Sequence, residues 1–305
     1  MRLVADIGGT NARLGLCASG VVDHRTVQRF SNAGWPNLSA VLATYLASHP
    51  GVILDEMVIA VAGPVGDGSA TLTNRNWTID AAILQASFNC DRAVLLNDLS
   101  ALGYAVPMLR ADQIVRVCGG DQPSEPMGQA LVVGIGTGFN ISQAITTSGG
   151  TVCPPAEAGH VSMPHSISKM LPAFNCDPEQ FPTVETLFSG RGLTNFCQNH
   201  TVKGVRTGED AIDLYSTMQG QQATDAINDY STLLGWLLRD LALSYMPSHG
   251  IYLAGSVARA IAKTAPDPLA KVLQASGQFR SPKSSAVYTI EDDGAALAGC
   301  GRYSN

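Results

Sequence analysis

The first hundred residues alternate between short apolar runs and longer segments with apolar residues at helical spacing. Apolar runs that end in glycine, proline or polar residues predict β-strands at 2–8, 13–18, 21–30, 57–64 and 93–98. Spacings of three and four predict helices from Pro36 to the stop at Pro50-Gly51, at 78–88 and at 99–109. This order predicts a mixed sheet with helices on its faces.

The second half of the chain repeats part of this pattern. Residues 131–141, LVVGIGTGFNI, resemble residues 2–12, because each segment places a two-glycine turn after an apolar strand, with Asp6 opposite Gly134. Spacings of three and four then predict a core-facing helix through Ile227, Tyr230, Leu234, Leu237 and Leu241, and a strand follows at 251–257. We therefore expect a second α/β domain of related plan, with a chance similarity as the alternative.

Composition narrows the class of protein. The chain has 305 residues, 45% hydrophobic and 14% charged, with a net charge of −6 and no run of Lys and Arg, so nucleic acid is not an expected partner. No apolar stretch approaches the length of a membrane span, and the apolar start of the chain is too short for a signal peptide. The seven cysteines are scattered and never spaced as CxxC, so we expect neither disulfides nor zinc, and a cytoplasmic location.

Two glycine turns are candidates for phosphate binding. The first is DIGGTN, residues 6–11, and the second is GIGTGF, residues 134–139. A glycine turn after a strand lets backbone N–H groups approach phosphate oxygens, and Thr10 and Thr137 add hydroxyl donors. Neither turn matches GxxxxGK[ST] or GxGxxG. One such turn alone is more often a tight connection, but one in each half suits a phosphate chain held between two domains.

Three acidic or amide side chains lie within or at the ends of apolar strands. Asp6 could hold Mg²⁺ near phosphates or could cap its own turn. Asn97 and Asp98 end a strand at the edge where open α/β sheets bind ligands. Asp98 is equally compatible with a general base and with a simple N-cap of the helix that follows.

Further polar candidates lie in the second half. Glu157 and His160 stand three apart in a proline- and glycine-rich segment, where they could grip vicinal hydroxyls, whereas a metal site is weaker because no third ligand is suitably spaced. Glu185 opens a predicted helix, where an acid is also favoured by the helix dipole alone.

Taken together, these segments resemble the bacterial ATP-dependent glucokinase family of the proteobacterial type, within the sugar kinase, actin and chaperone ATPase superfamily. The similarity runs from about residue 3 to about residue 300. It is carried, in order, by VADIGGTNARLGL, LLNDLSALGYAVPML, GIGTGFN, PAEAGHVSMP, VETLFSGRGL and IYLAGSVA.

The resemblance implies two ribonuclease-H-like α/β domains, the actin-like ATPase fold, around an interdomain cleft. The small domain would span 1–109 and be completed by the C-terminal helix at about 292–305, and the large domain would span 110–291. Asp98 would be the general base, and the sugar hydroxyls would be bound by Asn97, Asp98, Glu157, His160 and Glu185. ATP would be bound by Asp6, Gly8, Gly9, Thr10, Asn11, Gly136, Thr137, Gly138 and Gly255.

The chain also departs from the family pattern. Other residues stand where the family often has glycine or proline, at Asn140, Ala156, Ala158, Arg191 and Ser256. The acidic, amide and histidine candidates are intact. These departures therefore bear on nucleotide affinity and sugar choice more than on catalysis.

The expected activity is transfer of the ATP γ-phosphoryl group to the 6-hydroxyl of glucose, with Mg²⁺ held at Asp6. The cofactors would be ATP and Mg²⁺, and the resemblance implies a homodimer. Three alternatives remain: a kinase of another hexose, an inactive sugar-binding regulator, and an ATPase with a protein partner. A comparison of kcat/KM across a panel of hexoses would identify a kinase of another hexose. A regulator would release no ADP with any sugar, and an ATPase would hydrolyse ATP without sugar.

Overall fold

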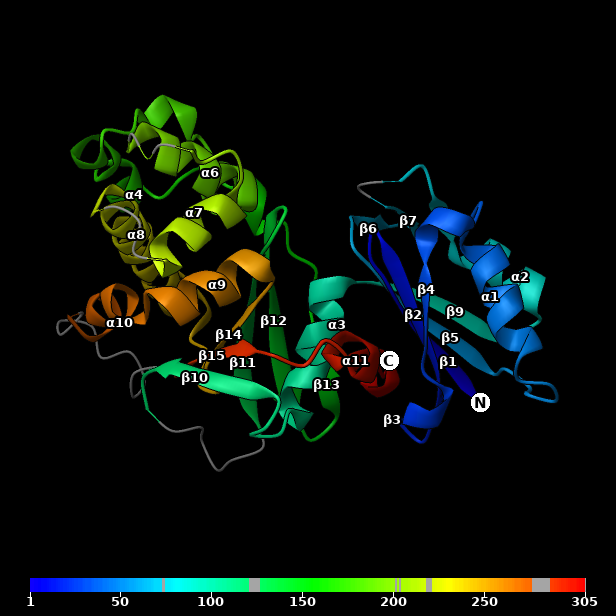
Figure 1. The fold of residues 1–305 in the computed structure, drawn as a ribbon. Helices are drawn as coiled ribbons and strands as arrows, with labels where there is room; N and C mark the ends of the chain where they lie inside the picture. Colours follow the sequence, from blue (N-terminus) through cyan, green and yellow to red (C-terminus); the bar gives the residue numbers. More distant parts are fainter. Residues whose placement is uncertain are drawn as a thin grey trace. The chain divides into compact units, whose positions relative to one another are not determined.

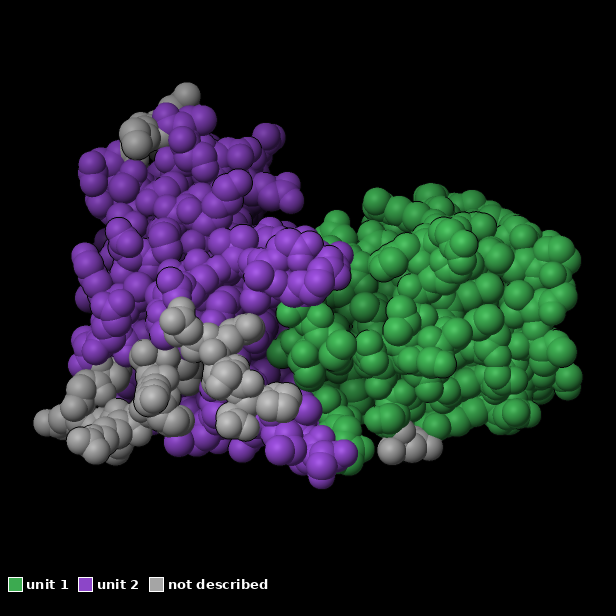
Figure 2. Space-filling model, turned by 90° about the horizontal axis from the view of Figure 1, so that it is seen from below, with its two compact units in different colours: residues 1–109, 149–155, 293–305 green, residues 110–148, 156–292 purple. Residues whose placement is uncertain are grey.

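The computed structural model describes residues 1–72, 75–120, 127–200, 202, 204–217, 221–275 and 286–304 (Figure 1). The chain forms two compact units, coloured separately in Figure 2. Unit 1 comprises residues 1–109, 149–155 and 293–305, and unit 2 comprises residues 110–148 and 156–292. The chain therefore passes from one unit to the other four times.

Unit 1 is built on a mixed sheet of six strands. Its strands are β1 (Arg2–Ile7), β2 (Asn11–Ala18), β3 (Val21–Val22), β4 (Gln28–Ser31), β5 (Glu56–Val61) and β9 (Arg92–Asn97). They lie in the order β3-β2-β1-β5-β9, and β4 also pairs with β2. Because β1, β5 and β9 are parallel, the residues that follow β1 and β9 lie at one edge of the sheet.

Alternation along β1 explains how helices cover both faces of this sheet. Leu3, Ala5 and Ile7 are buried in one core with residues of α1 (Leu38–Ala47) and α2 (Ala81–Phe88). Val4 points the other way and packs with residues of α3 (Asp98–Ala105) and α11 (Ala295–Arg302). Figure 1 shows these two helix layers. Because helices pack on both faces of the sheet, the ends of its strands are held in place, and so are the side chains that they carry.

The structure corrects two predicted elements of unit 1. The predicted strand 21–30 is two short strands, β3 and β4, separated by a 3-10 turn at His24–Thr26, because the side chain of Asp23 accepts a hydrogen bond from the amide of Arg25. The predicted helix 78–88 begins only at Ala81, where Asp80 caps α2. Residues before it belong to a small sheet of β6 (Val65–Gly66), β7 (Ser69–Thr71) and β8 (Thr78–Asp80).

Unit 2 contains the second sheet, in which strands follow the order β10-β15-β14-β11-β12. These strands are β10 (Ile114–Cys118), β11 (Gly128–Ile135), β12 (Phe139–Thr147), β14 (Ile251–Ala254) and β15 (Val287–Ile290), while β13 (Gly150–Val152) lies in the stretch assigned to unit 1. β11 is antiparallel to β12 and parallel to β14, as β1 is antiparallel to β2 and parallel to β5. The predicted α/β plan of the second half is confirmed.

Helices pack on the sheet of unit 2. They are α4 (His165–Ser168), α5 (Val184–Leu187), α6 (Gly190–Asn199), α7 (Gly208–Ser216), α8 (Gln221–Tyr245), α9 (Ser256–Thr264) and α10 (Pro266–Ala275). The predicted apolar face of α8 is buried with Leu131, Val133 and Ile135 of β11. In the described ranges no helix is both long and apolar enough to cross a membrane. Further 3-10 turns lie at Asn32–Gly34, Val106–Met108, Ala158–His160, Leu171–Phe174 and Pro178–Gln180.

Candidate active site

The first glycine turn joins β1 to β2 and is held by its carbonyl oxygens. The side chain of Asn32 donates to the carbonyl of Gly8 at 2.7 Å, and its backbone amide donates to the carbonyl of Thr10 at 2.8 Å. Arg75 donates from Nε to the carbonyl of Gly9 at 2.9 Å. Within the described residues, the amides of Gly9 and Thr10 donate to no protein group. The turn therefore has backbone donors to offer to a ligand.

Asp6 lies on β1, two residues before Gly8, and as a residue it is partly buried. Burial raises its pKa to about 6, with a further contribution from the negative charge of Asp98. Arg13, its cross-strand neighbour on β2, partly offsets this effect. Unit 1 therefore brings two carboxylates near enough to influence each other.

Asn97 and Asp98 stand where β9 becomes α3. The structure corrects the alternative role considered for Asp98, because the N-cap of α3 is Asn97 and Asp98 is the first helical residue. The amide of Leu99 donates to Oδ1 of Asn97 at 3.0 Å and to Oδ1 of Asp98 at 2.9 Å. Asn97 also donates to the carbonyl of Gly63 at 3.2 Å, so both side chains are oriented by backbone groups.

The electrostatics of Asp98 suit a proton acceptor. Burial raises its pKa to about 6, although hydrogen bonds from the amide of Leu99, from its own amide and from Asn97 favour the ionised form. A carboxyl group with this pKa is ionised at neutral pH and is more basic than an exposed aspartate.

The second glycine turn joins β11 to β12 in unit 2. The amide of Gly136 donates to the carbonyl of Gly138 at 3.0 Å, and the amide of Gly190 donates to the carbonyl of Gly136 at 2.8 Å. Among the residues that the structure describes, the amides of Thr137 and Gly138 donate to no protein group. This turn too has backbone donors to offer.

Gly255 lies beside this turn, at the end of β14. A Cβ added to Gly136 would lie 4.0 Å from the Cα of Gly255, which has a φ of +89°. A Cβ on Gly255 would come within 2.4 Å of the carbonyl oxygen of Ile135. Glycine is therefore required here by backbone packing, whether or not a ligand binds.

Glu185 reaches the second turn from the first turn of α5. Its Oε2 accepts a hydrogen bond from the amide of Phe139 at 3.0 Å. A Cβ on Gly138 would lie only 2.6 Å from the same oxygen, so glycine is needed for this close approach. Glu185 is more than the first-turn acid that a helix dipole alone would favour, because it links α5 to the glycine turn.

Glu157 is the N-cap of the 3-10 turn Ala158–His160 and His160 is its last residue, and both are exposed, in agreement with the predicted irregular segment. Gly159 between them is buried, since a Cβ there would strike the carbonyl oxygen of Phe139 at 2.3 Å. After this turn the amide of Val184 donates to the carbonyl of Val161 at 3.1 Å, which ties the segment to α5. Unit 2 therefore brings Glu157, His160 and Glu185 close to the second glycine turn.

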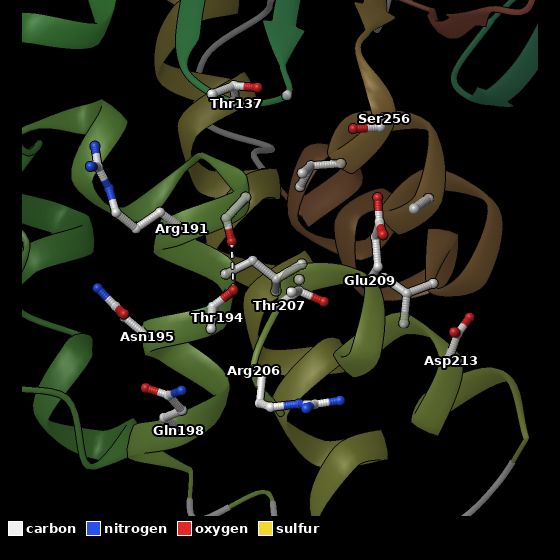
Figure 3. A pocket seen from close by; sticks show the side chains of 17 residues that line it. Thr137, Arg191, Thr194, Asn195, Gln198, Arg206, Thr207, Glu209, Asp213 and Ser256 are labelled. Carbon is white, nitrogen blue, oxygen red and sulfur yellow. Dashed lines mark hydrogen bonds between the residues drawn. The ribbon is translucent and has the colours of Figure 1, made fainter. Parts of the chain in front are cut away.

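A pocket of about 800 Å³ opens beside this turn within unit 2 (Figure 3). Its walls include Gly136 and Thr137 of the turn, Ser256 at the start of α9, and residues from the first turns of α6 and α7. Ser189 caps α6 and Thr207 caps α7, whereas α9 follows Gly255 and has no side-chain cap. The amide groups that open α9 are therefore available to a ligand.

Several of these residues are not among the sequence candidates. Asn32 and Arg75 hold the first turn from distant loops, and no motif marks them. Arg191 and Ser256, noted only as departures, line the pocket. The other newly found lining residues are Gly190, Leu193, Thr194, Asn195, Gln198, Arg206, Thr207, Gly208, Glu209, Ile212, Asp213, Val257 and Ala260. The capping pattern TGED at 207–210 is the one sequence signal that could have located α7.

Comparisons with known proteins agree over almost the whole chain. Residues 3–305 match the family model described as Glucokinase. A glucokinase of Cronobacter sakazakii is 28% identical over 99% of this chain and 96% of that protein. The solved glucokinase of an Antarctic psychrotroph has a TM-score of 0.84 and 24% identity over 99% of this chain and 97% of its own.

A more distant solved structure shares the fold. The glucokinase of the ROK family from Streptomyces griseus, in complex with glucose and AMPPNP, has a TM-score of 0.63 and 19% identity over 98% of this chain and 97% of its own. The two units therefore have the actin-like ATPase fold that the sequence predicts.

Proposed function

The chain belongs to the glucokinase family, and we propose that it transfers the γ-phosphoryl group of ATP to the 6-hydroxyl of D-glucose, forming glucose 6-phosphate and ADP. The observation that carries this proposal is the environment of Asp98. Its carboxyl group is oriented by the amide of Leu99 at the end of a buried strand, and its pKa is raised to about 6. These are the properties that a general base for a sugar hydroxyl requires.

We propose that Asp98 takes the proton of the 6-hydroxyl as that oxygen attacks the γ-phosphorus. The new bond joins the sugar oxygen to phosphorus, the bond to the bridging oxygen of ADP breaks, and ADP leaves with the electron pair. Phosphoryl transfer depends mainly on positioning and charge neutralisation. The remaining proposed roles are therefore roles in binding.

The two glycine turns are proposed to bind the phosphates of ATP. The unused amides of Gly9, Thr10, Thr137 and Gly138 support this role, since backbone donors in glycine turns suit anionic oxygens. Asn11, which follows the first turn as the first residue of β2, completes the proposed set there, with Gly8. The pocket beside the second turn has a volume suited to a nucleoside, which we place against Gly136 and Gly255.

Asp6 is the proposed ligand of Mg²⁺, directly or through water. Its carboxylate is a hard oxygen donor beside the first turn, and Mg²⁺ in kinases uses few carboxylates together with phosphate oxygens and water. The raised pKa of Asp6 fits this role, because a cation there would stabilise the ionised form. When bound, the ion supplies charge neutralisation for the transferred group.

Asn97, Glu157, His160 and Glu185 are proposed to bind the sugar hydroxyls, with Asp98 at the reacting one. Asn97 retains one acceptor lone pair for this role, because its capping bond uses only one lone pair of Oδ1, while its N–H groups serve Gly63 and Asp98. Glu157 and His160 support the role by their exposure beside the second turn. Recognition of the sugar is thus assigned mainly to unit 2 and proton transfer to unit 1.

We also propose that the enzyme is a cytoplasmic homodimer. The family resemblance supports the dimer, and the seven cysteines, all free, support a reducing compartment. Light scattering on a gel-filtration peak should give twice the chain mass of 31.9 kDa. A peak of single-chain mass would contradict the dimer.

The proposed function is tested by a coupled ADP-release assay with MgATP and a panel of hexoses. We expect ADP release that depends on sugar, with the largest kcat/KM for glucose. A larger kcat/KM for mannose, fructose or N-acetylglucosamine would reassign the substrate, an outcome that the departures at Asn140 and Arg191 make worth testing. No ADP release with any sugar would indicate a sugar-binding regulator, and sugar-independent release an ATPase.

A further inference from the structure

Asn140 connects the second glycine turn to the segment that carries Glu157. It is the second residue of β12, and Phe139 before it is buried in the core of unit 2 at 4% exposure. Because neighbouring residues of a strand point to opposite faces, the half-buried side chain of Asn140 faces away from that core. It faces the residues with which the chain re-enters unit 2, beginning at Ala156.

The carboxamide of Asn140 makes four hydrogen bonds, three of them to backbone. Its Oδ1 accepts from the amide of Ile141 at 2.8 Å and from the amide of Ala158 at 2.9 Å. Its Nδ2 donates to the carbonyl of Ala156 at 2.6 Å and, at a longer 3.4 Å, to Oε2 of Glu157. An asparagine side chain has two N–H donors and two acceptor lone pairs, so all four are used.

These partners fix the orientation of the carboxamide. Rotating it by half a turn would place its NH₂ group against two backbone amides and its oxygen against a carbonyl and a carboxylate. Every contact would then be repulsive. Asn140 is therefore locked, and through its bonds to Ala156 and Ala158 it locks the backbone on both sides of Glu157.

We propose that Asn140 is a positioning residue that sets sugar affinity and selectivity by holding Glu157 ready for the hexose. This inference rests on the proposed function, in which Glu157 binds a sugar hydroxyl. An exposed glutamate has several rotatable bonds, and ordering it before binding reduces the entropy lost when sugar binds. The fixed backbone sets where the carboxylate stands, and the Nδ2 contact sets where it points.

Two substitutions separate the parts of this role. Asn140→Gly removes all four hydrogen bonds without adding bulk or charge. Asn140→Asp keeps the shape and the acceptor oxygen, but replaces the NH₂ donor with a carboxylate oxygen that repels Glu157. Asn199→Asp is the matched control, because Asn199 is also in unit 2 and donates from its side chain to Gln180 at 2.9 Å, away from this segment.

The experiment is calorimetric titration of each purified full-length variant with glucose alone and with ADP alone, followed by kcat/KM for glucose and mannose. We expect the glucose Kd to rise about 10-fold in Asn140→Gly and further in Asn140→Asp, with the ADP Kd within about twofold of wild type. The ratio of kcat/KM for glucose over mannose should fall in both. Asn199→Asp should match the wild type throughout.

An unchanged glucose Kd in Asn140→Asp would overturn the inference. So would equal losses of glucose and ADP affinity, because they would assign Asn140 a general structural role in the β11–β12 hairpin. The wild-type protein in the same assay distinguishes the two levels. If wild type binds no glucose and releases no ADP, the proposed function itself has failed, whereas an active wild type with an unaffected Asn140→Asp rejects only the role of Asn140.

Discussion

The two glycine turns use one backbone design in different surroundings. Each follows a strand that is antiparallel to the next strand and parallel to a later one. The first turn closes between Ile7 and Ala12, and the second is one residue shorter, between Ile135 and Phe139. Both leave amides without protein partners in the described part of the chain.

What differs is the chemistry around each turn. The turn of unit 1 lies near Asp6 and Asp98, whose pKa values are both raised to about 6, and it is braced by side chains from distant loops. The turn of unit 2 is contacted by Glu185 and lies next to Asn140, which holds the Glu157 segment. In the proposed mechanism, one backbone design would bind phosphate in both units, beside the proposed base in unit 1 and beside the proposed sugar-binding residues in unit 2.

The largest effect is expected from Asp98→Asn. Loss of the base should lower kcat by about 10²–10⁴-fold, because an amide cannot accept the hydroxyl proton. The same change removes a desolvated charge, so the free energy of unfolding at pH 7 should rise, by about 1 kcal/mol. Steady-state kinetics and thermal unfolding check the two parts, and wild-type turnover in this variant would reject the assignment.

The raised pKa of Asp98 predicts an acid limb in the pH profile. Log kcat/KM should decline below pH 6, with a loss of about tenfold at pH 5, as the base becomes protonated. The free energy of unfolding should instead decrease as the pH rises. A carboxyl group with a raised pKa contributes stability at low pH that is lost as pH rises from about 4 through about 6, so Asp6 and Asp98 should make the unfolding free energy fall over that window. A profile flat down to pH 5 would contradict the assignment.

Replacing one glycine of each turn with alanine tests whether a sugar-binding side chain contacts the turn of unit 2 but not the turn of unit 1. Gly138→Ala would place Cβ 2.6 Å from Oε2 of Glu185 and should displace that side chain, raising the glucose Kd by about 10-fold. Gly8→Ala is the matched change in unit 1, where Cβ would meet only the carbonyl oxygen of Asn11 at 3.5 Å. Its glucose Kd should stay at the wild-type value, and equal effects of the two changes would remove the distinction.

The smallest effect is expected from Arg191→Pro in the pocket of unit 2. An exposed cation at the start of α6 attracts phosphate only weakly in water, so the KM for ATP should rise by about two- to fivefold at low salt. Arg191→Lys keeps the charge and serves as the control. If the increase does not shrink at high salt, the charge of Arg191 is not its cause.

Much of the site could be predicted because its residues sit in recognisable local contexts. Asp6, Asn97 and Asp98 follow or end apolar strands, and both glycine turns join strands as the alternation predicts. The strand predicted at 21–30 was wrong because the capping bond of Asp23 outweighs the apolar pattern around it.

Other parts of the site depend on contacts that local sequence does not encode. Asn32 and Arg75 reach the first turn across 24 and 66 positions of chain. Asn140 was visible only as a departure from a glycine, and its four hydrogen bonds depend on the path of residues 156–158. Contacts of this kind join residues that are distant in the chain, so they can be identified only once the fold is known.

The central claim is that unit 1 supplies the base and unit 2 the sugar recognition. Glucose Kd and kcat, measured side by side for Asp98→Asn and Glu157→Gln, test it most directly. We predict that Asp98→Asn loses turnover but keeps a glucose Kd within about threefold of wild type, whereas Glu157→Gln raises the glucose Kd by about 10-fold or more and keeps most of its kcat at saturating sugar. The reverse pattern, with glucose binding lost in Asp98→Asn and unchanged in Glu157→Gln, would contradict the claim.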